Sequence, residues 1–415
     1  RIFNNQQIDM IKFRIKGVVG TENISPKTDL VIEAVFEDFN IKKEVFSILD
    51  SVCNENTILA SNTSSLSVND LAKATNRPDR FVGLHFFYHP AKNRLIEIIP
   101  AETTSEQTLQ AVENYCKAMG KVVIVCKDRP GFVVNRFFVP WLNEACLLLE
   151  EGVASISQID SIACNAFDIG MGPFALMNLT GPSIALHATD YLAEQLNTSR
   201  YRGASNLREI VSNNELWEID NNTEYEKSVE EIVKERLLGQ VFTVSAQIVD
   251  EEICSKEDVD RGAKVGLRWN KGPFEIANEM GIDKVFKISK KYCELANMDI
   301  PALLQIQKEL DMAFDFSYVD IKIDNDIATV ILNRPEAMNA LNVDLINELG
   351  LKIDKLNHRD DISTIVIEGS GKAFVAGADV KFFVDKIKDN SFKEIYDFTA
   401  HGHNVLAKIE NSPKI

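Results

Sequence analysis

The chain has 415 residues, and at about 150 residues per domain this length predicts two to four domains. It carries 45 Lys and Arg against 62 Asp and Glu, a net charge of −17, and 45% of its residues are hydrophobic. Such a composition is ordinary for a globular protein and excludes a disordered, collagen-like or disulfide-stapled chain. The acidic balance argues against nucleic acid as a partner, because binding to phosphate backbones requires excess cations.

The cysteine pattern and the chain ends bear on location. Seven cysteines are scattered without a CxxC pair, which predicts reduced thiols of a cytoplasmic protein rather than disulfides or a metal site. No apolar run approaches the roughly 20 residues of a membrane helix, so no membrane partner is expected. The chain opens without Met and closes on NSPKI, and we expect it to be truncated at both ends.

Strands and helices alternate in residues 1–128, the first predicted domain. The strands are expected at residues 30–35 (LVIEAV), 57–60, 81–84, 95–99 and 121–125, and the helices at 41–52, 67–74 and 106–119. This alternation predicts an α/β fold with a doubly wound sheet. Ligands of such sheets bind beyond the carboxyl ends of the strands.

Residues 129–316 read as two copies of one helical unit, at 129–225 and 226–316, with a linker near 213–226. Identical residues recur 100 positions apart. The matched positions are Asp160 and Asp260, Ala163 and Ala263, the two Gly-Pro-Phe triplets at 172–174 and 272–274, and Asn178 and Asn278. A shared register over some twenty residues predicts duplication of a helical domain.

Residues 317–415 form the last predicted domain. Two alternating runs at 318–323 and 327–332 flank Asp-Asn-Asp, which predicts a hairpin. A helix is expected at 341–356 and a strand at 363–367. The loop FVAGAD at 374–379 then leads into another helix.

His85 and Glu97 form the first candidate site, because His85 ends the predicted strand at 81–84, Glu97 stands in the next one at 95–99, and neighbouring strands would bring them together. A carboxylate on one imidazole nitrogen raises the basicity of the ring, and the other nitrogen can then take a proton from a substrate hydroxyl. From these two residues alone, a core histidine satisfied by a nearby glutamate is the favoured interpretation.

Small polar groups follow the strand at 57–60. Asn62, Thr63, Ser64 and Ser65 could hold a substrate oxygen or a nicotinamide carboxamide, or could simply cap the next helix. Asn135 stands at the start of a predicted helix after Pro-Gly, where its amide could bind a substrate carbonyl.

These stretches together resemble the L-3-hydroxyacyl-CoA dehydrogenase family. The motifs are LVIEAV at 30–35, SNTSSL at 61–66, GLHFF at 83–87, LIEI at 95–98, PGFVVNR at 130–136 and GPF at 172–174. Their order and spacing match the family from near residue 14 to about residue 312. The resemblance implies a Rossmann-type NAD-binding domain followed by the duplicated helical dehydrogenase domains.

The resemblance also implies roles for individual residues. His85 is expected to be the general base and Glu97 its partner, while Ser64 and Asn135 bind the reacting oxygen and the thioester region. The cofactor NAD is expected at Val35, Phe36, Glu37, Lys42, Asn62 and Ser64.

Two departures from the family pattern matter. Tyr88 stands where the family usually has an asparagine that contacts the cofactor. No GxGxxG is present, although this turn holds the pyrophosphate on a helix N-terminus. We therefore expect an incomplete NAD-binding domain, and weak NAD binding by this chain alone.

Residues 328–342 (ATVILNRPEAMNALN) and 372–381 (KAFVAGADVK) resemble the amino-terminal part of the crotonase (enoyl-CoA hydratase/isomerase) family. By this resemblance the N–H of Ala378 is one donor to the thioester oxyanion, Gly377 permits the close approach, and the backbone at Ala376 faces the adenine of CoA. The second donor and the catalytic carboxylates are expected beyond Ile415. The crotonase domain is thus expected to be partial and without hydratase activity of its own.

Dehydrogenase first and crotonase second is the order of archaeal-type bifunctional enzymes. The resemblance implies NAD-dependent oxidation of (S)-3-hydroxyacyl-CoA to 3-oxoacyl-CoA, with a hydratase activity in the full-length protein. The expected substrates are acyl-CoA thioesters, such as crotonyl-CoA on a route to acetoacetyl-CoA, and the expected assembly is a homo-oligomer. The rivals are a two-domain dehydrogenase of the hydroxyisobutyrate or nucleotide-sugar type, and a non-catalytic CoA-binding fragment.

Overall fold

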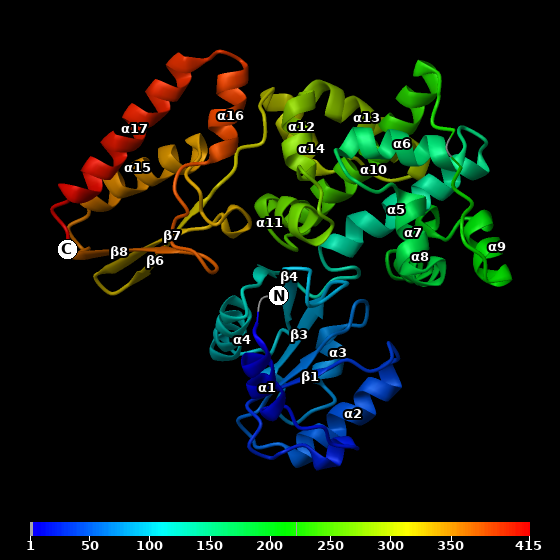
Figure 1. Cartoon of the computed structure of the whole chain (residues 1–415), viewed down its shortest axis with the longest axis horizontal. Helices are drawn as coiled ribbons and strands as arrows, with labels where there is room; N and C mark the ends of the chain where they lie inside the picture. The colour runs from blue at the N-terminus through cyan, green and yellow to red at the C-terminus, as the bar shows by residue number, and fades with distance from the viewer. Residues whose placement is uncertain (1–2, 221) are drawn as a thin grey trace. The chain divides into compact units, whose positions relative to one another are not determined.

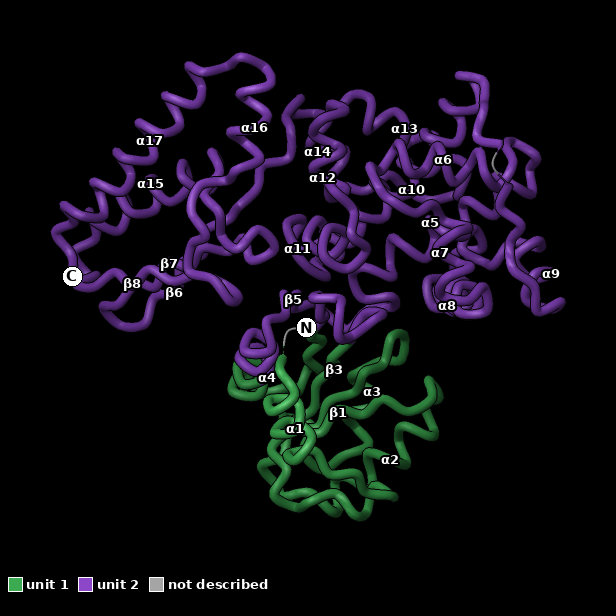
Figure 2. Tube along the Cα trace, in the orientation of Figure 1, with its two compact units in different colours: residues 1–85, 98–111 green, residues 86–97, 112–415 purple. Residues whose placement is uncertain are grey.

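The computed structural model describes residues 3–220 and 222–415. The chain divides into two compact units (Figure 2). The first unit comprises the residues up to His85 together with Ile98–Ala111, and the second comprises Phe86–Glu97 and Val112–Ile415. The boundaries predicted at 128, 225 and 316 remain a proposal about domain organisation.

The first sheet has five strands in the order β1-β2-β3-β4-β5. They are β1 (Leu30–Glu33), β2 (Ile58–Ser61), β3 (Phe81–Phe86), β4 (Leu95–Pro100) and β5 (Val122–Val125). β2 pairs in parallel with β1, where Leu30 lies opposite Ile58, and with β3, where Leu59 lies opposite Phe81. The predicted α/β fold with a parallel sheet is confirmed (Figure 1).

The first strand is shorter than the apolar run LVIEAV predicted. β1 ends at Glu33, because the N–H of Val35 donates to the side chain of Glu33 at 2.6 Å instead of joining the sheet. Val35 and Phe36 consequently lie in the loop after the strand, and both side chains are exposed.

Helices of this part of the chain follow most of the predicted spans. They are α1 (Asn5–Phe13), α2 (Phe39–Val52), α3 (Val68–Ala72) and α4 (Glu106–Ala118), with short 3₁₀ turns at Thr21–Asn23 and Pro78–Arg80. α2 begins where the side chain of Asp38 accepts the N–H of Ile41, a typical N-cap. α1 was not predicted, and it has no buried residue.

The middle of the chain is helical, as predicted. Its first copy holds α5 (Val134–Glu150), α6 (Ile156–Phe167), α7 (Pro173–Thr180), α8 (Pro182–Gln195), a 3₁₀ turn at Ser199–Tyr201 and α9 (Ser205–Asn213). The second holds α10 (Lys227–Asp250), α11 (Lys256–Arg261), a π-helical turn at Gly262–Gly266, α12 (Pro273–Met280), α13 (Ile282–Ala296) and α14 (Ala302–Leu310).

The predicted duplication is confirmed at atomic detail. Asp160 accepts the N–H groups of Phe174 and Ala175 at 2.8 and 2.9 Å. Asp260 accepts those of Phe274 and Glu275 at the same two distances. Each aspartate therefore satisfies the orphan donors at the start of the helix that opens with Gly-Pro-Phe.

The two asparagines of the repeat also act alike. The Asn178 side chain bonds both the N–H and the C=O of Trp217, and Asn278 does the same to Phe314. The two aromatic rings then meet Phe174 and Phe274 edge-on, each with 4.9 Å between ring centroids.

The last part has a three-stranded sheet, in the order β6-β7-β8. β6 (Val319–Asp324) and β7 (Ile327–Leu332) form the predicted antiparallel hairpin, and β8 (Thr364–Gly369) lies parallel to β7. A 3₁₀ turn at Pro335–Ala337, α15 (Val343–Asn357), α16 (Val380–Lys388) and α17 (Phe392–Glu410) complete it. The core is formed by the inner faces of β6, β7 and α15, with Val405 of α17.

Within the described residues, no helix combines the length and the apolar character needed to cross a lipid bilayer.

Candidate functional site

A buried ion pair lies at the carboxyl end of β1. Lys42 of α2 has no exposed surface, and its Nζ lies 2.8 Å from Oε1 of Glu33 and 3.3 Å from Oε2 of Glu37. The other oxygen of Glu33 accepts the hydroxyl of Ser61, at the end of β2, at 2.7 Å. The pair therefore fastens the ends of two neighbouring strands, which is the edge where parallel sheets bind ligands.

Glu37 organises the polar loop after β2. Its Oε1 accepts the hydroxyl of Thr63 at 2.6 Å and the backbone N–H groups of Ser64 and Ser65 at 2.8 and 2.9 Å. Burial raises the pKa of Glu37, but these hydrogen bonds and the charge of Lys42 outweigh burial, and the net pKa is lowered. The carboxylate stays charged and holds the loop in one conformation.

The sequence left open whether the polar residues after β2 merely cap the next helix, and the structure assigns that cap to another residue. Ser67, not Ser64 or Ser65, caps α3 by accepting the N–H of Asp70. Ser64, Asn62 and Glu37 thus lie in loops after β1 and β2, next to the exposed Val35 and Phe36. The predicted cofactor residues of the first unit are brought together, although their contacts with NAD remain a prediction.

Glu97 of β4 is fully buried, and its carboxylate has a role that the sequence did not reveal. Its Oε1 accepts the backbone N–H groups of Val133 and Val134, at 3.2 and 2.9 Å. These are the first amides of α5, the helix that carries Asn135 in its first turn. Glu97 therefore fixes the start of that helix and neutralises its positive end.

His85 stands near the end of β3, and its side chain is 6% exposed. Its pairing with Glu97 and its role as general base remain predictions. Tyr88, the departure from the family pattern, follows in the next loop with 75% of its side chain exposed.

Two parts of this arrangement were missed by sequence reasoning. Glu33 was not singled out, although a glutamate inside the apolar run LVIEAV is a signal for a buried charged partner. The amides of Val133 and Val134 carried no signal, because every residue other than proline has such an N–H.

The loop before α16 was the second predicted site. Ala378 forms a bridge with Leu341, in which the N–H of Leu341 donates to the C=O of Gly377 and the N–H of Asp379 donates to the C=O of Leu341. The Ala376 N–H donates to Met338. Within residues 3–220 and 222–415, the Ala378 N–H has no hydrogen-bond partner, since the bridge uses only the groups on either side of it.

Gly377 makes this loop possible. Its φ of +98° is a backbone conformation that residues with a side chain rarely adopt. The residues from Ala376 to Ala378 are exposed. The free N–H of Ala378 is thus held on a surface that a ligand can reach.

Comparison with known proteins identifies three family segments. Residues 1–129 match "3-hydroxyacyl-CoA dehydrogenase, NAD binding domain", residues 131–226 and 233–314 match "3-hydroxyacyl-CoA dehydrogenase, C-terminal domain", and residues 327–415 match "Enoyl-CoA hydratase/isomerase".

Individual relatives agree with these segments. A 3-hydroxybutyryl-CoA dehydrogenase from Clostridioides difficile is 41% identical over 188 residues, which are 45% of this chain and 67% of the relative. The fatty acid oxidation complex subunit alpha of Vibrio cholerae is 29% identical, over 71% of this chain and 45% of its own length. The chain thus spans less than half of that larger protein.

A solved structure supports the fold alone. The 3-hydroxybutyryl-CoA dehydrogenase of Escherichia coli superimposes with a TM-score of 0.67 at 18% identity, over 75% of this chain and 87% of the other.

The chain belongs to the 3-hydroxyacyl-CoA dehydrogenase family, and its last segment, residues 327–415, matches the enoyl-CoA hydratase/isomerase family model. The predictions of an enzyme, of the oxidoreductase class and of NAD as cofactor are confirmed at the level of the family.

Proposed function

We propose that the protein oxidises (S)-3-hydroxyacyl-CoA to 3-oxoacyl-CoA with NAD. The observation that carries this proposal is the Glu33–Lys42–Glu37 network, which fastens the loops after β1 and β2 at the edge where a dinucleotide binds.

The residues present fit NAD at this edge. Val35 and Phe36 offer exposed apolar surface beside the charged network, and Asn62 and Ser64 offer polar groups from the adjoining loop. Glu37 and Lys42 would hold these loops in place for the cofactor. When bound, NAD supplies the acceptor for the hydride that leaves C3 of the substrate.

The chain's own residues would handle the proton and the oxygen. His85 takes the proton of the 3-hydroxyl as general base, and Glu97 stabilises the imidazolium that forms. Ser64 and Asn135 bind the reacting oxygen and the thioester region. The bonds from the Val133 and Val134 amides to Glu97 support this assignment, because one carboxylate then orients both the base and the helix that carries Asn135.

A second activity is favoured by the free N–H of Ala378. A thioester carbonyl gains negative charge as an enolate forms, and a preorganised backbone donor stabilises that charge. With Gly377 opening the approach and Ala376 beside the adenine, we assign this loop to the acyl-CoA of an enoyl-CoA hydratase step. Hydration would produce the 3-hydroxyacyl-CoA that the dehydrogenase consumes.

The remaining assignments belong to the same proposal. They are an archaeal-type order of domains, with boundaries at 128, 225 and 316, a cytoplasmic location, and a homo-oligomer that binds neither nucleic acid nor membrane.

The proposal is tested by supplying NAD and either isomer of 3-hydroxybutyryl-CoA to the full-length protein. We expect oxidation of (S)-3-hydroxybutyryl-CoA, followed as NADH absorbance, and no oxidation of the (R) isomer. A protein that oxidises neither isomer, or both equally, would contradict the assignment.

A further inference from the structure

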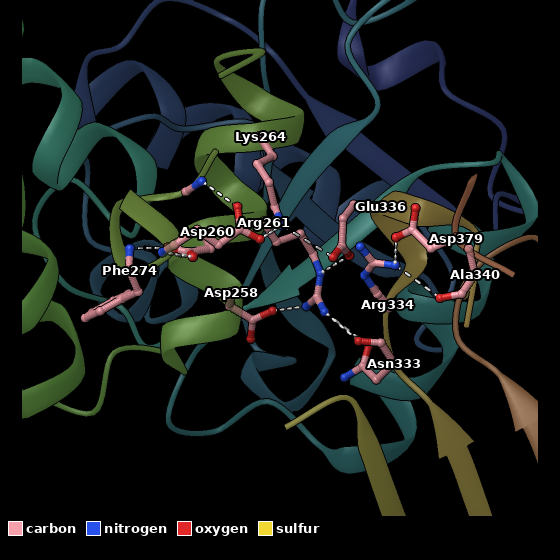
Figure 3. Close-up of polar contacts among 12 residues, drawn as sticks. Asp258, Asp260, Arg261, Lys264, Phe274, Asn333, Arg334, Glu336, Ala340 and Asp379 are labelled. Carbon is pink, nitrogen blue, oxygen red and sulfur yellow. Dashed lines mark hydrogen bonds and ion pairs between the residues drawn. The ribbon is translucent and has the colours of Figure 1, made fainter. Parts of the chain in front are cut away.

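Arg261, the last residue of α11, is a buried arginine that ties the helical part of the chain to the crotonase-like part. It is 3% exposed. Its guanidinium pairs with Asp258 one turn earlier, while Nε lies 3.2 Å from Glu336 and Nη2 donates to the backbone C=O of Asn333 at 3.0 Å. Figure 3 shows Arg261 between these groups. A planar fork with five donors can reach all three at once, which a lysine cannot.

Lys264 adds a second cation to the contact between Arg261 and Glu336. It lies in the π-helical turn that follows α11 and pairs with Glu275 at 2.6 Å and with Glu336 at 3.8 Å. Burial raises the pKa of Glu336, but the charges of Arg261 and Lys264 outweigh burial and the net pKa is lowered. Glu336 is therefore a charged carboxylate held between two cations of the helical part.

The segment that Arg261 contacts, residues 333–336, also supports the Ala378 loop. Arg334, between Asn333 and Glu336, donates to Asp379 at 2.7 Å and to the C=O of Ala340 at 3.1 Å (Figure 3). Asp379 directly follows Ala378.

A second set of hydrogen bonds joins the segment at 333–341 to the residues before the Ala378 loop. The Asn339 amide oxygen accepts the N–H of Arg334, and its NH₂ donates to the C=O groups of Ser370 and Ala373 at 2.9 and 2.8 Å. The position of the Ala378 N–H thus depends on residues 333–341, and those residues are anchored to Arg261.

We propose that Arg261 is a positioning residue for the crotonase-like site, which holds the Ala378 loop in place through Glu336, Arg334 and Asp379. The proposal rests on the function proposed for that loop. It gives the fusion a structural consequence, because the helical dehydrogenase part then completes the support of the neighbouring acyl-CoA site.

Hydrogen exchange in the full-length protein tests this directly, since Leu341 and Asp379 donate the two bonds that build the loop. We expect R261A to speed exchange of these two amides by about tenfold or more, while the helical repeat keeps its protection. The matched control is R236A, because the ion pairs of Arg236 stay with Glu144 and Glu151 of the helical part. Unchanged exchange in R261A would overturn the proposal.

Two further variants test the same proposal if R261A fails to fold. E336Q keeps the shape of the side chain and removes its charge, so it should loosen the same amides. R261K should restore little protection, because one ammonium cannot replace the fork. Unchanged exchange in E336Q, or full protection in R261K, would overturn the proposal.

A kinetic measurement separates this proposal from the proposed function. R261A should lower the hydratase kcat and leave the dehydrogenase rate unchanged. If the full-length wild-type protein hydrates no enoyl-CoA, the assignment of the loop is wrong, whereas the exchange data still decide whether Arg261 positions it.

Discussion

Lys42 illustrates how a single residue shapes the edge of the sheet at which we propose that NAD binds. It is a fully buried cation between two carboxylates, one at the end of β1 and one in the loop that follows. Such pairs add little net stability when formed, but removal of one partner leaves a buried charge without compensation. The arrangement therefore fixes a conformation more than it stabilises the fold.

From this we predict that K42M lowers the free energy of unfolding by about 3–5 kcal/mol in urea titrations. The double variant K42M/E33Q should recover part of that loss, because the fully buried side chain of residue 33 then carries no unpaired charge. K73M removes an exposed ion pair and should leave the titration midpoint unchanged. A loss in K42M no larger than in K73M would argue against the buried pair.

Glu37 makes stability depend on pH. Its folded-state pKa lies below the usual 4.5, so its contribution is fully present above 4.5 and is lost as the pH falls through the folded-state value. E37Q should thus be less stable than the wild type at neutral pH, and the difference should shrink in acid. Thermal melts over a pH series check this, and a difference that does not vary with pH would refute it.

At the scale of elements, the strength and the limit of sequence reasoning can be seen in the repeat. Identical residues 100 positions apart were enough to predict two copies. The matching bonds of Asp160 and Asp260 to the first turns of α7 and α12 bear this out. The bond from Val134 to Glu97 was out of reach, because backbone amides leave no pattern and the partners lie 37 residues apart. The Arg261–Glu336 pair, 75 residues apart, was missed because a sequence does not show which distant charged side chains meet.

The glycine of the first Gly-Pro-Phe triplet provides a test. A Cβ on Gly172 would lie 2.5–2.6 Å from atoms of Asp160, including its backbone Cα, whereas a Cβ on Gly170 would meet nothing within 4 Å. G172A should therefore cost about 1–3 kcal/mol of stability through overpacking, and G170A should cost nothing measurable. Equal melting temperatures for the two variants would contradict this account of the repeat.

At the scale of the whole molecule, the two sites that we propose for consecutive reactions lie on one chain. The dehydrogenase site residues and the loop at Ala378 were predicted from ordered motifs, and their roles stay predictions. Only the structure showed that the N–H of Ala378 is free within the described part of the chain, because the bridge to Leu341 uses the groups on either side of it and a sequence does not show which backbone groups are already hydrogen-bonded.

The two activities should be separable. A378P deletes the proposed oxyanion donor and should lower hydratase turnover of the full-length protein by about 10²–10³-fold, while NADH-dependent reduction of acetoacetyl-CoA is unaffected. Loss of enoyl-thioester absorbance with crotonyl-CoA measures the first activity. A variant that retains full hydratase turnover would show that Ala378 is not the donor.

The central claim is that His85 is the base of an NAD-dependent dehydrogenase, and the most direct test is the rate of NADH oxidation with acetoacetyl-CoA in H85Q. The account predicts a fall of about 10²–10⁴-fold, with the fold retained by circular dichroism. H187Q, which changes an exposed histidine of α8, serves as the control and should match the wild type. An H85Q protein that reduces acetoacetyl-CoA at the wild-type rate would contradict the assignment.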